Sequence, residues 1–292
     1  MSEFVFLNDS LADADEAQIS VHDTGLLHGV GLFETMRSYN GKVFRLDDHL
    51  DRLFRSATAL NITITQSRDE MTTAIDKLLE ANQLRDGRLR LTVTSGSIRS
   101  GNVGEDQQPQ NTLIITAGQM NPYPNELYRY GAIVIISSCK QNPDDPTSGH
   151  KVLNFLPRLL ALREAQTKKT AEALWFTTTN RLAEGCVSNV FIVHNNKLLT
   201  PPLDTPVLPG ITRKVVLELA RQNDIECEEH ELVIKDLLEA TEVFLTNSIM
   251  ELMPLRQVEA HKVADERPGP VYQKLHELYR QAVEQECADQ HG

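Results

Sequence analysis

The sequence has little of what marks a secreted, membrane-spanning or disulfide-rich protein. Only four cysteines occur among 292 residues, and they show neither a CxxC pair nor metal-ligand spacing: Cys139, Cys186, Cys227 and Cys287. This pattern favours free thiols in a reducing compartment. The first residues, MSEFVFLNDS, have no basic segment and no apolar run, so we expect no signal peptide. No apolar stretch approaches the length of a membrane span.

Positive charge is also scarce. Lys and Arg total 29 against 41 Asp and Glu, which gives a formal net charge of -12. Nucleic-acid binding needs a basic face, so this balance argues against it. Together with the cysteine pattern and the missing apolar run, this leads us to expect a cytoplasmic protein with no nucleic-acid, membrane or metal partner.

Short apolar segments with strand or helix spacing follow one another along the whole chain. The segment GLFETMRSYNGKVFRL predicts a β-hairpin, because Asn40 and Gly41 tolerate the positive φ angles of a tight turn. Asp47 is expected to cap a helix that starts near Asp48. Further helices are predicted for RDEMTTAIDKLLEANQL, NFLPRLLALREAQTKK, GITRKVVLELARQND and PVYQKLHELYRQAVEQE, and strands for FVFLN, RLRLTVTSG, NTLIITAG, GAIVIISS, EALWFTT, VSNVFIVHNNKLLT and EVFLTN.

The segment GQMNPYPNELY interrupts this pattern. Its two prolines and polar composition disfavour both a helix and a central strand. We therefore predict a small domain at 1–119, a linker at 120–124 and a larger domain at 125–292, both within the usual size range of domains.

Four stretches carry residues that chemistry could use. Lys151 stands before an apolar helical run, and it is either an ordinary solvated lysine or an amine activated by burial to form a Schiff base. Glu184 in LAEGCVSNVF is either a turn residue or a carboxylate that keeps a heteroaromatic nitrogen protonated. The neighbouring Ser188 and Asn189 either close a turn or contact a ligand.

The other two stretches suit a phosphate. In LPGITRKVV, Ile211 and Thr212 offer backbone N–H groups and a hydroxyl at a helix start, although Thr212 as a plain N-cap is nearly as good an interpretation. In HLDRLFRS, Arg52 is either a helix-edge charge or a planar partner for a phosphate. Ser248 follows the predicted strand EVFLTN, with Ile249 after it, where ligand contacts are common.

Together these groups describe one ligand, pyridoxal 5'-phosphate (PLP). An amine, a carboxylate for a ring nitrogen and several phosphate donors match its parts. The protein would bind and orient the cofactor, and the cofactor would act as the electron sink.

The ordered motifs DTGLLHGVGLFETMR, HLDRL, KxLNxL, EGxxSNVF, LPGITR and TNSIMELMP resemble those of the class IV (fold-type IV) PLP-dependent enzymes. The resemblance covers nearly the whole chain. It implies an α+β fold with a small α/β N-terminal domain and a larger C-terminal domain with an antiparallel, barrel-like β core. It also implies a homodimer with active sites between the domains, near the dimer interface.

The resemblance assigns roles to matching residues. Lys151 matches the Schiff-base lysine, and Glu184 matches the carboxylate that faces the pyridine nitrogen. Arg52, Ile211, Thr212 and Ser248 match phosphate-binding residues, with Ile249 beside them, while Ser188 and Asn189 match residues on the other side of the cofactor.

Three activities occur in this family. The KxLNxL form, with Phe155 where branched-chain aminotransferases usually carry tyrosine, favours a D-amino-acid transaminase, as do LPGITR and EGxxSNVF. A 4-amino-4-deoxychorismate lyase is the second candidate, because Thr35 and NSIMELMP resemble its segments, although Glu34 argues weakly against it. A branched-chain L-amino-acid aminotransferase is third. A catalytically silent PLP-binding protein is disfavoured, because both Lys151 and Glu184 are retained.

The substrate pocket departs from the D-amino-acid transaminase pattern. Phe33 replaces the usual tyrosine, and the loop SGSIRSGNVG has Arg99 but no histidine. Arg88 and Arg90 are substitute carboxylate ligands, and strand alternation predicts that both point to the same side. A solvated strand face is the competing interpretation. His28 is predicted near the substrate entrance, with a turn histidine as the alternative.

Overall fold

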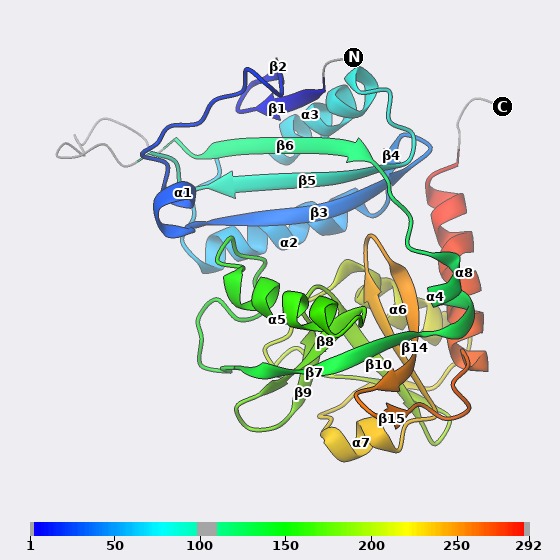
Figure 1. Ribbon diagram of the computed structural model, residues 1–292. Helices are drawn as coiled ribbons and strands as arrows, with labels where there is room; N and C mark the ends of the chain where they lie inside the picture. Colours follow the sequence, from blue (N-terminus) through cyan, green and yellow to red (C-terminus); the bar gives the residue numbers. More distant parts are fainter. Residues whose placement is uncertain (1–2, 98–109, 289–292) are drawn as a thin grey trace. The chain divides into compact units, whose positions relative to one another are not determined.

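The computed structural model describes residues 3–97 and 110–288. Its contacts divide the chain into two compact units (Figure 1). Unit 1 comprises residues 1–121, 150–154 and 283–292, and unit 2 comprises residues 122–149 and 155–282. The first boundary falls inside the predicted linker at 120–124. The segment around Lys151 and the C-terminal end, by contrast, group with unit 1 rather than with the predicted second domain.

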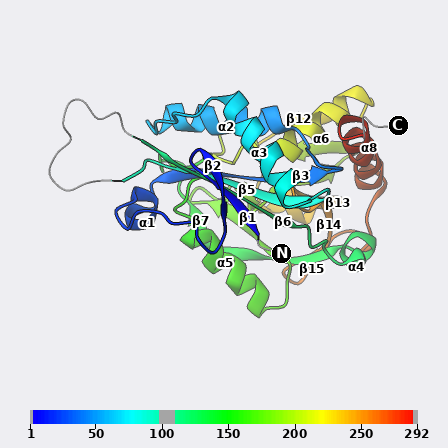
Figure 2. The same cartoon turned by 90° about the horizontal axis from the view of Figure 1, so that it is seen from above.

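Unit 1 is built on one six-stranded sheet with the strand order β2-β1-β6-β5-β3-β4. Its elements are β1 Phe4–Leu7, β2 Ser10–Asp13, α1 Thr24–His28, β3 Gly31–Tyr39, β4 Lys42–Val43, α2 Leu46–Ala59, α3 Arg68–Ala81, β5 Gly87–Thr94 and β6 Thr112–Gln119. Helices α2 and α3 pack on one face of this sheet (Figures 1 and 2). Leu53 of α2, Leu78 of α3 and Leu89 of β5 lie in the core between them.

Unit 2 contains a nine-stranded sheet with the order β12-β11-β10-β13-β14-β7-β8-β9, in which β15 also pairs with β14. Its elements are α4 Asn125–Tyr130, β7 Ala132–Gln141, α5 Leu156–Thr167, β8 Glu172–Thr177, β9 Leu182–Gly185, β10 Asn189–His194, β11 Lys197–Thr200, α6 Ile211–Gln222, β12 Cys227–Glu229, α7 Ile234–Leu238, β13 Glu242–Asn247, β14 Glu251–Val258, β15 His261–Lys262 and α8 Pro270–Glu286, of which residues 283–286 group with unit 1. Most strand pairs are antiparallel, whereas β7 runs parallel to both β8 and β14, and β11 runs parallel to β12. The α+β expectation is confirmed.

Local signals in the sequence explain several element boundaries. Asn40 and Gly41 have φ angles of 53° and 79°, as the predicted β3–β4 turn requires. Pro157 lies in the first turn of α5, where a missing N–H costs nothing. The prediction for Asp47 is wrong: α2 begins at Leu46, its N-cap is Arg45 and no side chain caps it. Asp47 instead lies in the first turn, where a carboxylate favours the helix dipole.

All four cysteines are free thiols, as predicted. Among the described residues, no helix is both long enough and apolar enough to cross a membrane.

Candidate active site

Lys151 lies at an edge of the unit 1 sheet. The segment 150–154 extends along the free edge of β3, with a bridge between Leu32 and Val152. The Phe33 N–H donates to the Lys151 carbonyl at 2.9 Å, and the Leu153 N–H donates to the Gly31 carbonyl at 3.0 Å. These bonds fix the backbone of Lys151 beside β3, although the two are more than 110 residues apart in sequence.

Alternation along β3 and β5 gathers the predicted substrate residues on one face. Leu32 and Met36 are buried in the core with α2 and α3, so Phe33 and Thr35 point to the opposite face. On β5, the buried residues Leu89 and Leu91 likewise place Arg88 and Arg90 on that opposite face. The prediction that both arginines share a face is therefore confirmed, and both are exposed.

The Phe33 ring is in contact with both an amine and a guanidinium. The Lys151 Nζ lies 4.4 Å from the ring centroid, and the Arg90 Cζ lies 3.8 Å from it. Both distances are within the range of cation–π attraction. Partial burial, and then the nearby charge of Arg88, lower the pKa of Arg90 from its usual value, yet a guanidinium stays charged at neutral pH. This face therefore offers an amine and an anion ligand around one ring.

On the helix face of the same sheet, Glu34 joins Arg52 and His49. Arg52 donates from Nε to Glu34 Oε1 at 2.8 Å and from Nη2 to Oε2 at 2.5 Å. All three side chains are buried. Burial raises the pKa of Glu34, but the charge of Arg52 and the bonds from Arg52 and His49 outweigh it and lower this pKa to about 2.

Glu34 also fixes the tautomer of His49. Burial lowers the pKa of His49, more than the Glu34 carboxylate raises it, so the ring is neutral near pH 7. His49 Nδ1 lies 2.7 Å from Glu34 Oε2. Because Glu34 is ionised and can only accept, Nδ1 carries the proton. Arg52 itself donates to Glu34 from both Nε and Nη2 and is held rigidly.

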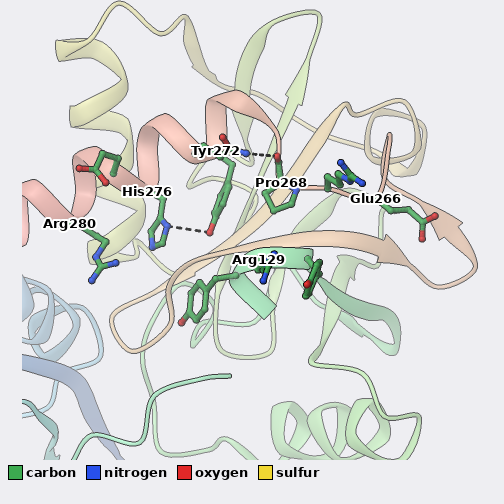
Figure 3. Close-up of a pocket in the computed structure, with 11 residues that line it drawn as sticks. Arg129, Glu266, Pro268, Tyr272, His276 and Arg280 are labelled. Atoms are coloured by element: carbon green, nitrogen blue, oxygen red, sulfur yellow. Dashed lines mark hydrogen bonds between the residues drawn. The ribbon is translucent and has the colours of Figure 1, made fainter. Parts of the chain in front are cut away.

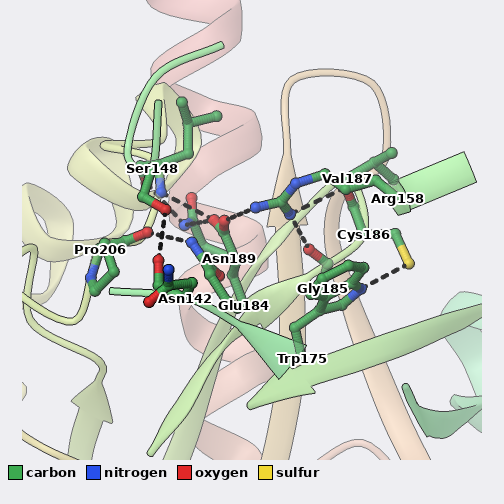
Figure 4. Close-up of polar contacts among 12 residues, drawn as sticks. Asn142, Ser148, Arg158, Trp175, Glu184, Gly185, Cys186, Val187, Asn189 and Pro206 are labelled. Atoms are coloured by element: carbon green, nitrogen blue, oxygen red, sulfur yellow. Dashed lines mark hydrogen bonds and ion pairs between the residues drawn. The ribbon is translucent and has the colours of Figure 1, made fainter. Parts of the chain in front are cut away.

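In unit 2, Glu184 on β9 is the centre of a buried polar cluster (Figure 4). Arg158, from the first turn of α5, donates from Nη2 to Glu184 Oε1 at 2.5 Å. The Leu208 N–H and Asn189 Nδ2 lie 3.0 and 3.4 Å from Oε2. A carboxylate has about four acceptor positions, so Glu184 can accept from one more donor.

Asn189 connects Glu184 to the start of α6. Its Nδ2 donates to the Leu208 carbonyl at 2.9 Å. Gly210 is the N-cap of α6, and a Cβ there would lie 1.9 Å from Asn189 Oδ1, so the position requires glycine. No side chain caps α6, and Ile211 and Thr212, both buried, occupy its first turn. The interpretation of Thr212 as N-cap is therefore wrong, and the first N–H groups of α6 suit an anion.

The turn after β13 lies beside the same end of β10. Thr246 pairs with Asn189, and Asn247 Nδ2 donates to the Val187 carbonyl at 3.1 Å. Asn247 Oδ1 accepts from the Ile249 and Met250 N–H groups at 2.8 Å each, which shapes the turn that carries Ser248. The Thr246 hydroxyl is buried and has no hydrogen-bond partner within residues 3–97 and 110–288.

Ser188 is directed to Glu172. The Ser188 hydroxyl donates to Glu172 Oε2 at 3.0 Å, and the Val187 N–H donates to Oε1 at 2.7 Å. A Cβ at Gly185 would lie 2.3 Å from Glu172 Oε1, so this carboxylate packs directly under the β9–β10 turn. Burial raises the pKa of Glu172 to about 7 despite the two donors.

Glu172→Gln is expected to change how stability depends on pH. The folded-state pKa of Glu172 is raised above the ordinary 4.5, so between pH 4.5 and 7 the folded chain binds more protons than the unfolded chain. This group therefore lowers the free energy of unfolding by about 3 kcal/mol as pH rises through that window. Glutamine removes this titration. The free energy of unfolding of Glu172→Gln, measured in urea and taken relative to that of wild type, should therefore be larger at pH 8 than at pH 4.5.

A matched control is Glu284→Gln, which removes an exposed carboxylate on α8 and should keep the wild-type profile. Parallel wild-type and Glu172→Gln profiles would contradict the raised pKa.

Two predicted substrate residues are not brought to the Phe33 face by any described contact. His28 is exposed in the last turn of α1, and Arg99 lies outside the described residues. Conversely, sequence reasoning missed Arg158 and Glu172 as partners of Glu184 and Ser188. The one signal for Glu172 was its place as a charged residue at the start of the apolar strand EALWFTT. No local pattern pointed to Arg158.

The donor set fits PLP. Lys151 supplies an amine, Glu184 a buried carboxylate with acceptor capacity, and α6 an uncapped N-terminus for a phosphate. The unpartnered Thr246 hydroxyl, next to the Ser248 turn, is a further donor in unit 2. When bound, PLP supplies the electron sink for bond cleavage at the substrate Cα.

Comparisons with known proteins agree on the family and differ on the substrate. The chain is 36% identical over 279 residues to a putative branched-chain-amino-acid aminotransferase of Methanocaldococcus jannaschii, covering 94% of this chain and 95% of that one. It is 30% identical over 286 residues to a D-alanine aminotransferase of Listeria monocytogenes, covering 98% of each. It is 31% identical over 281 residues to the aminodeoxychorismate lyase of Bacillus subtilis, covering 96% of this chain and 94% of the lyase.

A solved structure with the amine form of the cofactor has the same fold. The branched-chain amino acid aminotransferase of T.th. with pyridoxamine 5'-phosphate matches with a TM-score of 0.89 and 27% identity, covering 97% of this chain and 94% of that one. The family profile described as Amino-transferase class IV matches residues 31–258. The chain therefore belongs to the class IV aminotransferases, two-domain α+β enzymes of fold-type IV that use pyridoxal phosphate.

Proposed function

We propose that this enzyme transfers the amino group between a D-amino acid, such as D-alanine or D-glutamate, and a 2-oxo acid, either 2-oxoglutarate or pyruvate. The observation that carries the proposal is the arrangement of Lys151 and Arg90 around the Phe33 ring. In an α-amino acid the carboxylate is bonded directly to Cα, the carbon that bears the amine. A guanidinium close to the Lys151 amine can therefore hold that carboxylate while Lys151 works at Cα.

The predicted cofactor-binding residues have the following roles in this proposal. With the cofactor bound, the Lys151 amine would hold its aldehyde carbon, and the same amine would move the proton at the substrate Cα. Glu184 keeps the ring nitrogen protonated, and Arg158 and the Leu208 N–H orient its carboxylate. Arg52, Ile211, Thr212, Ser248 and Ile249 bind the phosphate, and Ser188 and Asn189 lie at the other side of the ring.

The proposed preference for D- over L-amino acids is based on sequence features. The KxLNxL motif with Phe155, together with LPGITR, favours the D-amino-acid type. Branched-chain L-amino-acid transamination is the second candidate, favoured by the 36% identical relative of that name. The lyase reaction is a third, favoured by the 31% identical lyase and by Thr35 on the Phe33 face.

Half-reactions with single amino acids separate these candidates. Loss of the visible band of the lysine-bound cofactor with D-alanine or D-glutamate, but not with L-alanine or L-leucine, is the expected result. Bleaching by L-leucine or L-isoleucine alone would replace the proposal with the branched-chain activity. Pyruvate release from aminodeoxychorismate without an amino acceptor would replace it with the lyase.

Arg90→Ala is expected to raise the KM for 2-oxoglutarate about 10- to 100-fold, because a hydrogen bond to a charged group contributes about 1.5–3 kcal/mol. Arg88→Ala, on the same face two residues away, tests whether the neighbouring guanidinium shares the role. Arg163→Ala, an exposed arginine of α5, is the control and should leave KM unchanged. If KM for the acceptor stays at its wild-type value in Arg90→Ala, this guanidinium does not hold the substrate carboxylate.

We further propose that the active enzyme is a homodimer. Large apolar side chains are exposed in unit 1 along 19–30, including Val21 at 69% and Leu26 at 62%. In unit 2, Leu156, Leu159 and Leu160 of α5 are exposed by 58, 41 and 50%. Contiguous exposed apolar residues mark interaction surfaces, and a second copy would cover them. Light scattering of the purified protein tests this.

We also propose that the enzyme works in the cytoplasm, because its free thiols fit a reducing compartment.

A further inference from the structure

A hollow of about 640 Å³ lies in unit 2 and shares no lining residue with the predicted cofactor site. It is formed by α4, by the loop before α8 and by α8 itself. In Figure 3, Tyr272, His276 and Arg280 extend from α8 toward the segment that carries Arg129. Its volume is within the range of small-molecule sites.

The charges around the hollow favour an anion. Arg129, Arg267 and Arg280 line it, and none of them forms an ion pair with a carboxylate within the part of the chain that the structure describes. The two acids that also line it are engaged elsewhere. Glu266 is paired with Lys262 at 2.6 Å, and Glu277 accepts from Gln281 at 2.9 Å. In a chain with a net charge of -12, this local excess of arginine is not a consequence of general basicity.

The walls of the hollow favour a flat ring. Tyr128 and His276 are stacked with centroids 5.8 Å apart and planes at 6°, and His276 is stacked on Tyr272 at 5.5 Å. Tyr130 is 51% exposed, and the Arg129 guanidinium lies 5.2 Å from its ring centroid. Aromatic faces and guanidinium planes are the groups on which planar ligands stack.

The ring stack is held in place before any ligand arrives. The Tyr128 hydroxyl donates to the Met250 carbonyl at 3.1 Å, and the Tyr272 hydroxyl donates to the Leu252 carbonyl at 3.3 Å. His276 Nε2 lies 3.5 Å from a Glu251 carboxylate oxygen. Since both tyrosine hydroxyls and His276 are anchored to residues 250–252, where β14 begins, little side-chain entropy remains to be lost on binding.

We propose that this hollow is a second, non-catalytic binding site for an aromatic ring that bears an anionic group. The ring stacks against Tyr130 or the end of the Tyr128–His276 stack, and the anion is held by Arg267 and Arg280. Both a nucleotide and an aromatic carboxylate have this chemistry, and the test separates them.

Calorimetric titration of the PLP-loaded enzyme with four probes tests the site. AMP and benzoate each combine a ring with an anion, whereas adenosine and inorganic phosphate carry only one of the two. At least one of the combined probes should bind with one site per chain, and more tightly than either partial probe. Tighter binding of AMP identifies a phosphate-bearing ligand, and tighter binding of benzoate identifies a carboxylate.

Variants locate the binding. Arg267→Ala and Arg280→Ala should each weaken the better probe about tenfold or more, which is the effect of losing a charge-assisted hydrogen bond. Both should retain transaminase activity. Arg221→Ala, an exposed arginine of α6 outside the hollow, should bind as wild type does. The proposal is overturned if no probe binds at millimolar concentration, if phosphate alone binds as well as AMP, or if the double variant Arg267→Ala/Arg280→Ala binds normally.

Discussion

Lys151→Ala is expected to abolish transamination with every amino acid and to remove the visible band of the lysine-bound cofactor. Lys151 is fixed beside β3 by two backbone hydrogen bonds to Gly31 and Phe33, with its Nζ 4.4 Å from the Phe33 ring. In the proposed mechanism, the change removes both the covalent anchor of the cofactor and the group that moves the proton at Cα. A positioned proton-transfer group alone contributes roughly 10²- to 10⁴-fold, so turnover should fall by at least that factor.

Two further variants show whether the loss of activity is specific to the amine of Lys151. Lys151→Arg keeps a positive charge at the same place but supplies no usable nucleophile, and it should be as inactive as the alanine variant. Lys77→Ala, an exposed lysine of α3 in the same unit, should keep full activity. Added methylamine should restore part of the proton transfer in Lys151→Ala. Normal turnover in Lys151→Ala, or equal losses in Lys77→Ala, would remove Lys151 from the mechanism.

The sequence was a good guide to most features whose determinant is local, although it misplaced the N-caps of α2 and α6. Periodicity located the helices that begin at Arg68, Leu156, Ile211 and Pro270, because each helix-forming run lies within one segment. Alternation on β5 correctly placed Arg88 and Arg90 on one face. Motif order identified the family, since each motif fixes a short stretch of backbone with its own chemistry.

What the sequence could not provide depends on contacts between distant segments. The segment 150–154 groups with unit 1 because it adds to the edge of β3, and no local pattern encodes such a pairing. Glu172, 12 residues before Glu184, meets the β9–β10 turn only after β8 and β9 have paired. The partner of Arg52 was missed for the same reason, because Glu34 lies on a strand and Arg52 on a helix.

Glu34→Ala is expected to cost the folded state about 3–5 kcal/mol, the loss measured when one member of a buried ion pair is removed. The variant leaves the Arg52 guanidinium buried without its carboxylate and takes from His49 the acceptor of its Nδ1 proton. The free energy of unfolding in urea at pH 7 measures this loss. In wild type the contribution of Glu34 is present above the ordinary pKa of 4.5 and is lost as pH falls toward about 2, so the difference between variant and wild type should shrink in acid.

The double variant Glu34→Leu/Arg52→Met distinguishes a lost pair from a damaged core. If the cost comes from the stranded charge, replacing both partners by apolar side chains should recover most of the stability, because no buried guanidinium then remains unpaired. Cofactor retention should not recover with it, since we propose that Arg52 also binds the phosphate. Stability in the double variant as low as in Glu34→Ala would instead mean that the shape of the cluster, rather than its charge balance, holds α2 against β3.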